Sequence, residues 1–308
     1  MKNSVQALAL AGGQNIPAVG FGTYLIEDEK VSNLVEQAIS LGYRHIDTAE
    51  IYANEAGVGQ GIRCAVADCG LTRQDIFVTT KMWPGHEAWN QPAKTYQSTL
   101  RALDESLARL KLEYVDLYLI HAPLQPDLRL DQWRAMLELQ QQGKARAIGV
   151  SNYGPTHLNE IEASGMAMPA VNQIELHPWS QKPELVSHLR QRDIAIVAYS
   201  SLAPLANWRD GAGETGARVE HRKALEETGD APFRTLADKY GVTEPQLLLR
   251  WGLQRGFGVL PKSTHPARIG QNFELFGFAI DEPDMARISA MDRGNGLAWG
   301  LDDPTLKP

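Results

Sequence analysis

The chain has 308 residues, of which 43% are hydrophobic and 22% charged, which is typical of a folded globular protein and not of a disordered or fibrous one. Its net charge of −7 argues against broad binding to nucleic acid or to an anionic membrane, because phosphate surfaces attract a basic face. Cys64 and Cys69 have no metal-ligand partner at the usual spacing. We therefore expect ordinary thiols in a reducing compartment and no metal site.

The apolar runs of the sequence are short. None approaches the roughly 18 residues of a membrane span. Near the N-terminus the uninterrupted apolar run covers only Ala7 to Ala11, which is shorter than the roughly 7–15 residues of a secretory signal. We expect a cytoplasmic protein, as a monomer or weak homodimer, with a small-molecule substrate and no nucleic-acid or membrane partner.

Short apolar strands and amphipathic helices alternate along most of the chain. Residues 6–10 and 16–21 flank Gly12 and Gly13 and predict a small hairpin. Apolar residues then recur at helical spacing from Val31 to Ile39, and the strand at His45–Asp47 follows. Further strands are predicted at residues 76–81, 114–121, 147–152, 171–175, 194–199 and 258–262. Helices are predicted at residues 55–68, 156–163, 233–240, 244–254, 267–276 and 285–291. Further helices are indicated by the apolar residues from Leu100 to Leu110, by Trp133, Met136 and Leu137, and by Leu185, Val186 and Leu189.

This alternation gives about eight strand–helix pairs, the number in a closed parallel (β/α)₈ TIM barrel. Strands that are apolar throughout also fit a parallel sheet buried on both faces. An open doubly wound sheet is the alternative, but residues 20–24 do not form the Gly-x-Gly-x-x-Gly turn that it would require. We expect one α/β barrel domain over residues 1–308, with an N-terminal β-hairpin, extra helices and a C-terminal tail over the active-site face. The polar insertion from about Asn207 to Asp230 fits a mobile lid or a surface loop equally well.

Polar or ionisable residues end seven successive apolar strands. In a barrel of this kind the carboxyl ends of the strands share one rim, where the chemistry takes place. Each residue alone fits a cap or a solvated strand end, but together they predict a site. They are Asp47, Lys81, His121, Ser151 with Asn152, Gln173 with Glu175, Tyr199 and Lys262.

Tyr52, which follows Asp47 by five residues, gives this rim a chemical interpretation. A tyrosine has an ordinary pKa near 10 and transfers protons reluctantly at neutral pH. A nearby ammonium such as that of Lys81 would lower this pKa, and Asp47 would hold the lysine in place. His121 would donate a second hydrogen bond to the substrate oxygen. Two donors at one oxygen predict carbonyl reduction, provided that a hydride source lies beside them.

The sequence from about residue 5 to residue 300 resembles the aldo-keto reductase superfamily. The order and spacing of the matching stretches carry the resemblance, since any one of them alone is a weak signal. They are Gly42–Tyr52, Val78–Trp83, Asp116–His121, Gly149–Asn152, Asn172–Pro178, Ala198–Ser200 and Leu260–Thr264 with Arg268 and Asn272.

The resemblance implies a (β/α)₈ fold and the NADPH-dependent, reversible reduction of aldehydes and ketones. The family's catalytic tetrad would be Asp47, Tyr52, Lys81 and His121, with Tyr52 as the general acid. Relatives that reduce carbon–carbon double bonds have a glutamate at the position of His121. A non-catalytic NADPH-binding barrel with a regulatory or structural role remains the alternative, and the intact tetrad favours the enzyme.

The resemblance also assigns cofactor positions. Tyr199 would stack on the nicotinamide ring, and Lys262 with Arg268 would bind a 2′-phosphate, which NAD lacks, through charge-assisted hydrogen bonds. Ser151, Asn152 and Gln173 would hold the carboxamide; Thr23, Ser200 and Leu202 would follow the pyrophosphate; and Asp47, Ser263, Thr264, Gln271 and Asn272 complete the set, the last two near the adenine.

The sequence indicates the residues of the substrate pocket less clearly than the type of reaction. Tyr24, Trp83, His121 and Trp299 are its candidate walls, and Ala122 replaces a large aromatic residue of many relatives, which implies extra room. Small sugar-derived ketones, aliphatic or aromatic aldehydes and keto esters all remain open as substrates.

Overall fold

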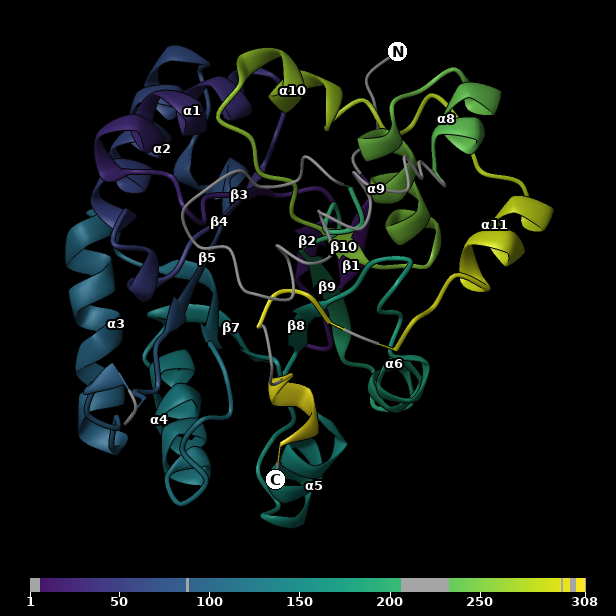
Figure 1. Ribbon diagram of the computed structural model, residues 1–308. Coiled ribbons are helices and arrows are strands. Elements are labelled where there is room, and N and C mark those ends of the chain that lie inside the picture. The colour runs from purple at the N-terminus through teal and green to yellow at the C-terminus, as the bar shows by residue number, and fades with distance from the viewer. Residues whose placement is uncertain (1–5, 87–88, 206–232, 295, 300–302, 308) are drawn as a thin grey trace.

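Eight parallel strands, surrounded by helices, form the centre of the molecule (Figure 1). The computed structural model describes residues 6–86, 89–205, 233–294, 296–299 and 303–307. The strands follow one another in the sheet in the order of the sequence, so that each strand pairs with the strand before it. They are β3 (Phe21–Gly22), β4 (His45–Asp47), β5 (Phe77–Met82), β6 (Val115–Ile120), β7 (Ala145–Ser151), β8 (Val171–Glu175), β9 (Ala195–Tyr199) and β10 (Gly258–Val259).

The two edges of this sheet meet and close it into a barrel. Val19, just before β3, forms a parallel bridge with Val259 of β10. The amide of Val259 donates to the carbonyl of Ala18 over 2.7 Å, and the amide of Gly20 donates to the carbonyl of Val259 over 2.9 Å. Closure satisfies the backbone groups that an open edge would expose. The predicted (β/α)₈ barrel is thereby confirmed.

The predicted N-terminal hairpin lies at the end of the barrel where the strands begin. It consists of the antiparallel strands β1 (Ala7–Ala9) and β2 (Asn15–Pro17). Leu10 and Ile16 pack with barrel residues such as Leu117 and Val171 in one buried apolar cluster. The side-chain amide of Gln14 donates to the carbonyl of Arg146, at the start of β7. The hairpin therefore covers one end of the barrel and leaves the carboxyl ends of the strands for the site.

The helices pack around the outside of the strands (Figure 1). Their apolar faces bury residues such as Val31, Leu103 and Trp133 against the barrel. They are α1 (Asp28–Ser40), α2 (Glu55–Asp68), α3 (Tyr96–Leu110), α4 (Arg129–Gln141), α5 (Pro155–Ala163), α6 (Pro183–Arg190), α8 (Arg234–Tyr240), α9 (Glu244–Gln254), α10 (Pro266–Gln271) and α11 (Glu282–Ser289), with short 3₁₀ turns η1 (Glu50–Tyr52), η2 (Arg73–Asp75) and η4 (Pro304–Leu306).

Helix α2 contains glycines that let it approach its neighbours closely. A Cβ at Gly57 would lie 2.3 Å from the carbonyl oxygen of Asp28 in α1. A Cβ at Gly59 would lie 2.0 Å from the carbonyl oxygen of Leu110 at the end of α3. Glycine weakens an isolated helix, so its presence here is explained by backbone contact on two sides. This packing fixes the helix that follows Tyr52.

Two predicted elements end several residues earlier than expected. The core helix expected at residues 267–276 ends at Gln271, because the chain turns tightly at Asn272 and Phe273 packs on Tyr43 with ring centroids 4.5 Å apart. The strand expected at residues 258–262 ends at Val259, so that Lys262 lies on the loop beyond it. The insertion at about Asn207–Asp230 lies outside the described residues. Among the helices that the structure describes, none is long and apolar enough to span a membrane.

Candidate active site

Asp47, Lys81 and Tyr52 meet at the carboxyl ends of β4 and β5. The ammonium of Lys81 donates to Asp47 Oδ1 over 2.6 Å and to the carbonyl of Thr48 over 2.9 Å. Its Nζ lies 3.5 Å from Tyr52 Oη. Lys81 is 0% exposed, so its charge is shielded from bulk water and depends on these groups. Burial lowers the pKa of Lys81 below its ordinary value, while the Asp47 carboxylate acts in the opposite direction.

A buried asparagine holds the loop that carries Tyr52. Tyr52 lies at the end of η1, and the next residue, Ala53, adopts a left-handed conformation with φ of 54°. The amide nitrogen of Asn54 donates to the carbonyls of Thr23 and Ile26, both over 2.9 Å. Its amide oxygen accepts from Thr48 Oγ1 over 2.8 Å. Asn54 thus joins the loops after β3 and β4 and fixes the direction of Tyr52.

His121 follows β6 and faces Tyr52 across the site. The two rings lie edge to face with centroids 5.7 Å apart. Burial and, as the second cause, the positive charge of Lys81 hold the pKa of His121 well below its ordinary value. The imidazole is therefore neutral near pH 7, with one ring N–H available as a donor.

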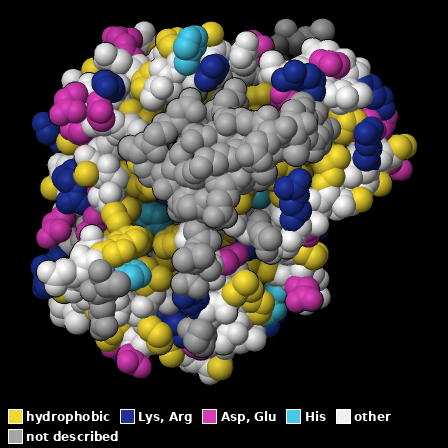
Figure 2. Space-filling model, in the orientation of Figure 1, with side chains coloured by type: hydrophobic (Ala, Val, Ile, Leu, Met, Phe, Trp, Pro, Cys, Tyr) yellow, Lys and Arg dark blue, Asp and Glu magenta, His cyan; other side chains and the backbone are white. Residues whose placement is uncertain are grey.

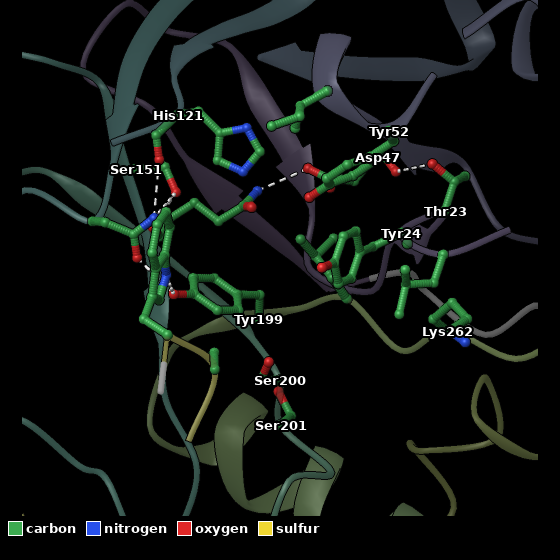
Figure 3. A pocket seen from close by; sticks show the side chains of 18 of the residues that line it. Thr23, Tyr24, Asp47, Tyr52, His121, Ser151, Tyr199, Ser200, Ser201 and Lys262 are labelled. Carbon is green, nitrogen blue, oxygen red and sulfur yellow. Dashed lines mark hydrogen bonds between the residues drawn. The ribbon is translucent and has the colours of Figure 1, made fainter. Parts of the chain in front are cut away.

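These side chains line a cavity of about 550 Å³. Figure 3 shows His121, Tyr52 and Tyr24 around it, with Tyr199 below and Lys262 at one end. Figure 2 shows hydrophobic side chains gathered left of centre on this face of the molecule. The described residues that line the cavity come from all eight barrel strands or the loops after them, and from the C-terminal tail at Ala298 and Trp299. Lys81 of β5 is buried and is not among them.

A hydrogen-bonded network forms the floor of the cavity. Gln173 Nε2 donates to Asp47 Oδ2 over 2.8 Å, and Ser151 Oγ donates to the carbonyl of Gln173 over 2.7 Å. Tyr199 Oη donates to Asn152 Oδ1 over 2.6 Å, and Asn152 Nδ2 donates to the carbonyl of His121 over 2.9 Å. The network ties β4, β6, β7, β8 and β9 together beneath the site.

The sequence matches a known family. A model described as "Aldo/keto reductase family" matches residues 18–293. The chain belongs to the aldo/keto reductase family.

Individual relatives agree with the family match. The chain is 37% identical to the "9,11-endoperoxide prostaglandin H2 reductase" of Trypanosoma cruzi, over 98% of this chain and 97% of that protein. It is 38% identical to the "Morphine 6-dehydrogenase" of Pseudomonas putida, over 92% and 90% of the two chains. A Bombyx mori aldo-keto reductase, solved in complex with NADP, superimposes with a TM-score of 0.81 at 35% identity, over 95% of this chain and 94% of that chain.

As a member of the aldo/keto reductase family, the protein is an NADP-dependent oxidoreductase that acts on carbonyl groups. It reduces aldehydes and ketones with NADPH. The alternative of a non-catalytic NADPH-binding barrel receives no support from these relatives.

The predicted cofactor residues of this reductase fall into two groups. Thr23, Asp47, Ser151, Asn152, Gln173, Tyr199, Ser200, Leu202 and Lys262 line the cavity. Ser263, Thr264, Arg268, Gln271 and Asn272 do not line it; they lie on the loop after β10 and on α10. Within this second group Thr264, Arg268 and Gln271 are exposed, whereas Asn272 is buried at the end of the helix.

Several features of the cavity fit a dinucleotide. Ser201 Oγ is buried in the cavity wall and has no hydrogen-bond partner among the residues that the structure describes. Ser200, beside it, has a left-handed φ of 56°, a strained conformation that often occurs at ligand sites. Gln173 retains a second amide hydrogen beyond the one that Asp47 accepts. The residues present can therefore accept phosphate and carboxamide groups.

The substrate end of the reductase cavity is aromatic. Tyr24, Trp83, His121 and Trp299, all predicted, line it, whereas Ala122 is buried and is not among the lining residues. The sequence interpretation missed Trp89, which is 54% exposed and stacks on Trp83 with parallel rings 5.3 Å apart. Trp89 lies on no regular strand or long helix, so the strand-end pattern could not find it. Only its position six residues after Trp83, in a stretch rich in aromatic residues, gave a signal.

Proposed function

We propose that Tyr52 gives the proton in the carbonyl reduction that this enzyme performs. The observation that carries this proposal is the buried Lys81 ammonium, 3.5 Å from Tyr52 Oη. When the proton leaves, the phenolate acquires a negative charge beside this ammonium in a water-poor site, where the attraction is strong. The nicotinamide of bound NADPH would supply the hydride to the carbonyl carbon.

Asp47 and His121 then have supporting roles. Asp47 Oδ1 fixes the direction of the buried Lys81 ammonium. Neutral His121 donates its ring N–H to the carbonyl oxygen and leaves the proton transfer to Tyr52. Tyr199 offers its ring as the stacking surface for the nicotinamide, since its hydroxyl is fixed by Asn152.

The test of this function is the consumption of NADPH by the purified protein with a panel of aldehydes and ketones. Exposed apolar side chains at the cavity, Tyr24, Leu25 and Trp89, favour apolar carbonyl compounds over polyhydroxylated sugars. We therefore expect turnover of apolar aldehydes at lower KM than that of sugar-derived ketones. Equal KM values for both classes would contradict the proposed preference, and no turnover with any carbonyl would contradict the function.

We further propose that Lys262 and Arg268 select NADPH over NADH by binding the 2′-phosphate. Replacing Arg268 with alanine should raise the KM for NADPH by about 10- to 100-fold, because hydrogen bonds to charged groups contribute about 1.5–3 kcal/mol. The KM for NADH should change little, since NADH lacks this phosphate. Arg287→Ala, an exposed arginine on α11, is the matched control. An equal rise in both KM values for Arg268→Ala would refute the role.

We also propose that residues 1–308 form a single domain that works in the cytoplasm as a monomer or weak homodimer. The family match over residues 18–293 and the predicted reduced thiols support this view. Sedimentation velocity over a range of protein concentrations tests the assembly state, and a stable higher oligomer would contradict it. Detection of the protein outside the cytoplasm in fractionated cells would contradict the location.

A further inference from the structure

The C-terminal tail is attached to a buried carboxylate at the end of β8. Glu175, which is 3% exposed, accepts from the amide of Leu297 over 2.6 Å and from that of Ala298 over 3.0 Å. His177 Nε2 lies 3.0 Å from the same carboxylate. Burial would raise the pKa of Glu175, but the bonds from His177 and the two amides lower it overall, so that the group stays ionised. A Cβ at Gly296 would lie 2.7 Å from Glu175 Oε2, so the tail backbone passes directly over the carboxylate.

The next tail residue, Trp299, enters the cavity. Its Nε1 donates to Tyr199 Oη over 2.8 Å. Its ring lies nearly parallel to that of Trp83, at an angle of 8° and with centroids 6.4 Å apart. The two indoles are therefore nearly parallel where both line the cavity.

The wall formed by Trp83 is well fixed. Its Nε1 donates to Gln91 Oε1 over 2.5 Å, and its backbone amide donates to Glu50 Oε2 over 3.0 Å. Trp89 stacks on it with nearly parallel rings, 4° apart. The wall formed by Trp299 depends on the tail, which is held on one side by Glu175 and on the other by the ion pair of Asp303 with Lys182.

We propose that Glu175 is a positioning residue that holds Trp299 parallel to Trp83, and that the slot between the two indoles selects carbonyl substrates carried on a flat ring. The inference rests on the proposed reductase function and names its substrate class.

The dimensions of the slot favour flat groups. A ring stacked between two others needs about 3.5 Å on each side, or about 7 Å between the outer rings. The centroids lie 6.4 Å apart, so the gap between the two ring planes is at most 6.4 Å and a flat ring requires an outward shift of the tail. A puckered ring is thicker and requires a larger one. Trp83 also contacts His121, with centroids 5.4 Å apart, so that a carbonyl on a ring in the slot lies near the proposed donors.

Benzaldehyde and cyclohexanecarbaldehyde form a matched pair of probes, because both carry an aldehyde on a six-membered ring and differ chiefly in flatness. For the wild-type enzyme with NADPH we expect a lower KM for benzaldehyde. Trp299→Ala should reduce the ratio of the two KM values by about three- to tenfold, the range expected for the loss of one aromatic pair. Trp299→Phe retains a flat face and should retain most of the ratio. Comparing ratios between variants cancels the different intrinsic reactivity of the two aldehydes.

Glu175→Gln removes the charge that holds the tail and should reduce the KM ratio by about two- to fivefold with a smaller effect on kcat. Glu55→Gln is the matched control, because Glu55 is an equally buried carboxylate, held by Thr80 and Arg109, that does not line the cavity. It should leave the ratio unchanged even if it lowers stability. If Glu175 acts through Trp299, the double variant Glu175→Gln with Trp299→Ala has the same ratio as Trp299→Ala alone.

Two outcomes overturn the inference: a wild-type enzyme that does not discriminate between the probes, or a Glu175→Gln variant that discriminates as well as wild type. The binding of benzamide and cyclohexanecarboxamide to the protein with NADP provides a second measurement without turnover. A preference for benzamide that Trp299→Ala abolishes supports the slot even if no aldehyde is reduced, and equal affinities overturn it. Failure of the slot and failure of the reductase function are thereby distinguished.

Discussion

Replacing Tyr52 with phenylalanine should lower kcat for aldehyde reduction by about 10²- to 10⁴-fold, the usual contribution of a positioned general acid. The substitution removes one hydroxyl and keeps the ring that packs on Tyr24, with centroids 4.9 Å apart. The cavity should therefore keep its shape, and the affinity for NADPH should be unchanged. Steady-state kinetics and a fluorescence titration with NADPH provide the two measurements.

Tyr24→Phe is the control for this experiment. Tyr24 lines the same cavity, yet its hydroxyl has no part in the proposed proton transfer. We expect its kcat to stay within about threefold of wild type. If Tyr52→Phe also retains wild-type turnover, the proton comes from another group and the assignment is wrong.

The second large effect is expected at Lys81. Replacing Lys81 with methionine removes the ammonium beside Tyr52 and should lower kcat by about 10²-fold or more. It also leaves Asp47, which is 4% exposed, without its counter-charge. Removing one partner of a buried pair commonly costs about 3–5 kcal/mol, so we expect a fall of that order in the free energy of unfolding. Urea denaturation and the NADPH assay measure the two effects.

A double variant separates the two roles of the pair. Lys81→Met combined with Asp47→Asn removes both charges, so that no unpaired charge stays buried. Stability should recover partly, by about 1–3 kcal/mol relative to Lys81→Met, whereas activity should not recover. Recovery of activity together with stability would show that Lys81 acts only by holding the fold together.

Much of the barrel and its rim could be predicted because these features follow from local patterns. Apolar strands that end in Asp47, Lys81 and His121 share one rim in any parallel barrel, so the order of the elements alone brings them together. Helix α2 begins and ends where predicted, at Glu55 and Asp68, although its glycines weaken it in isolation. The family resemblance added roles that periodicity could not supply.

What could not be predicted depends on contacts between distant segments. Glu175 was recognised as a strand end, but the tail amides that it binds lie more than 120 residues later in the chain. Trp89 lies on a loop without periodicity, and Phe273 leaves its helix to pack on Tyr43. In each case tertiary packing decides the conformation, and a single sequence does not record which distant residue will be the neighbour.

The two carboxylate oxygens of Asp47 bind two residues with different proposed roles. Oδ1 accepts from Lys81, and Oδ2 accepts from Gln173, a residue proposed to hold the carboxamide. A bound group that forms a hydrogen bond with Gln173 weakens or strengthens the bond from Gln173 to Asp47. It thereby changes how much of the Asp47 charge acts on Lys81 and, through Lys81, on Tyr52. By thermodynamic reciprocity, cofactor affinity and the acidity of the proton donor then depend on each other. The pH dependence of NADPH affinity would report this coupling, and the Gln173→Leu variant should abolish it.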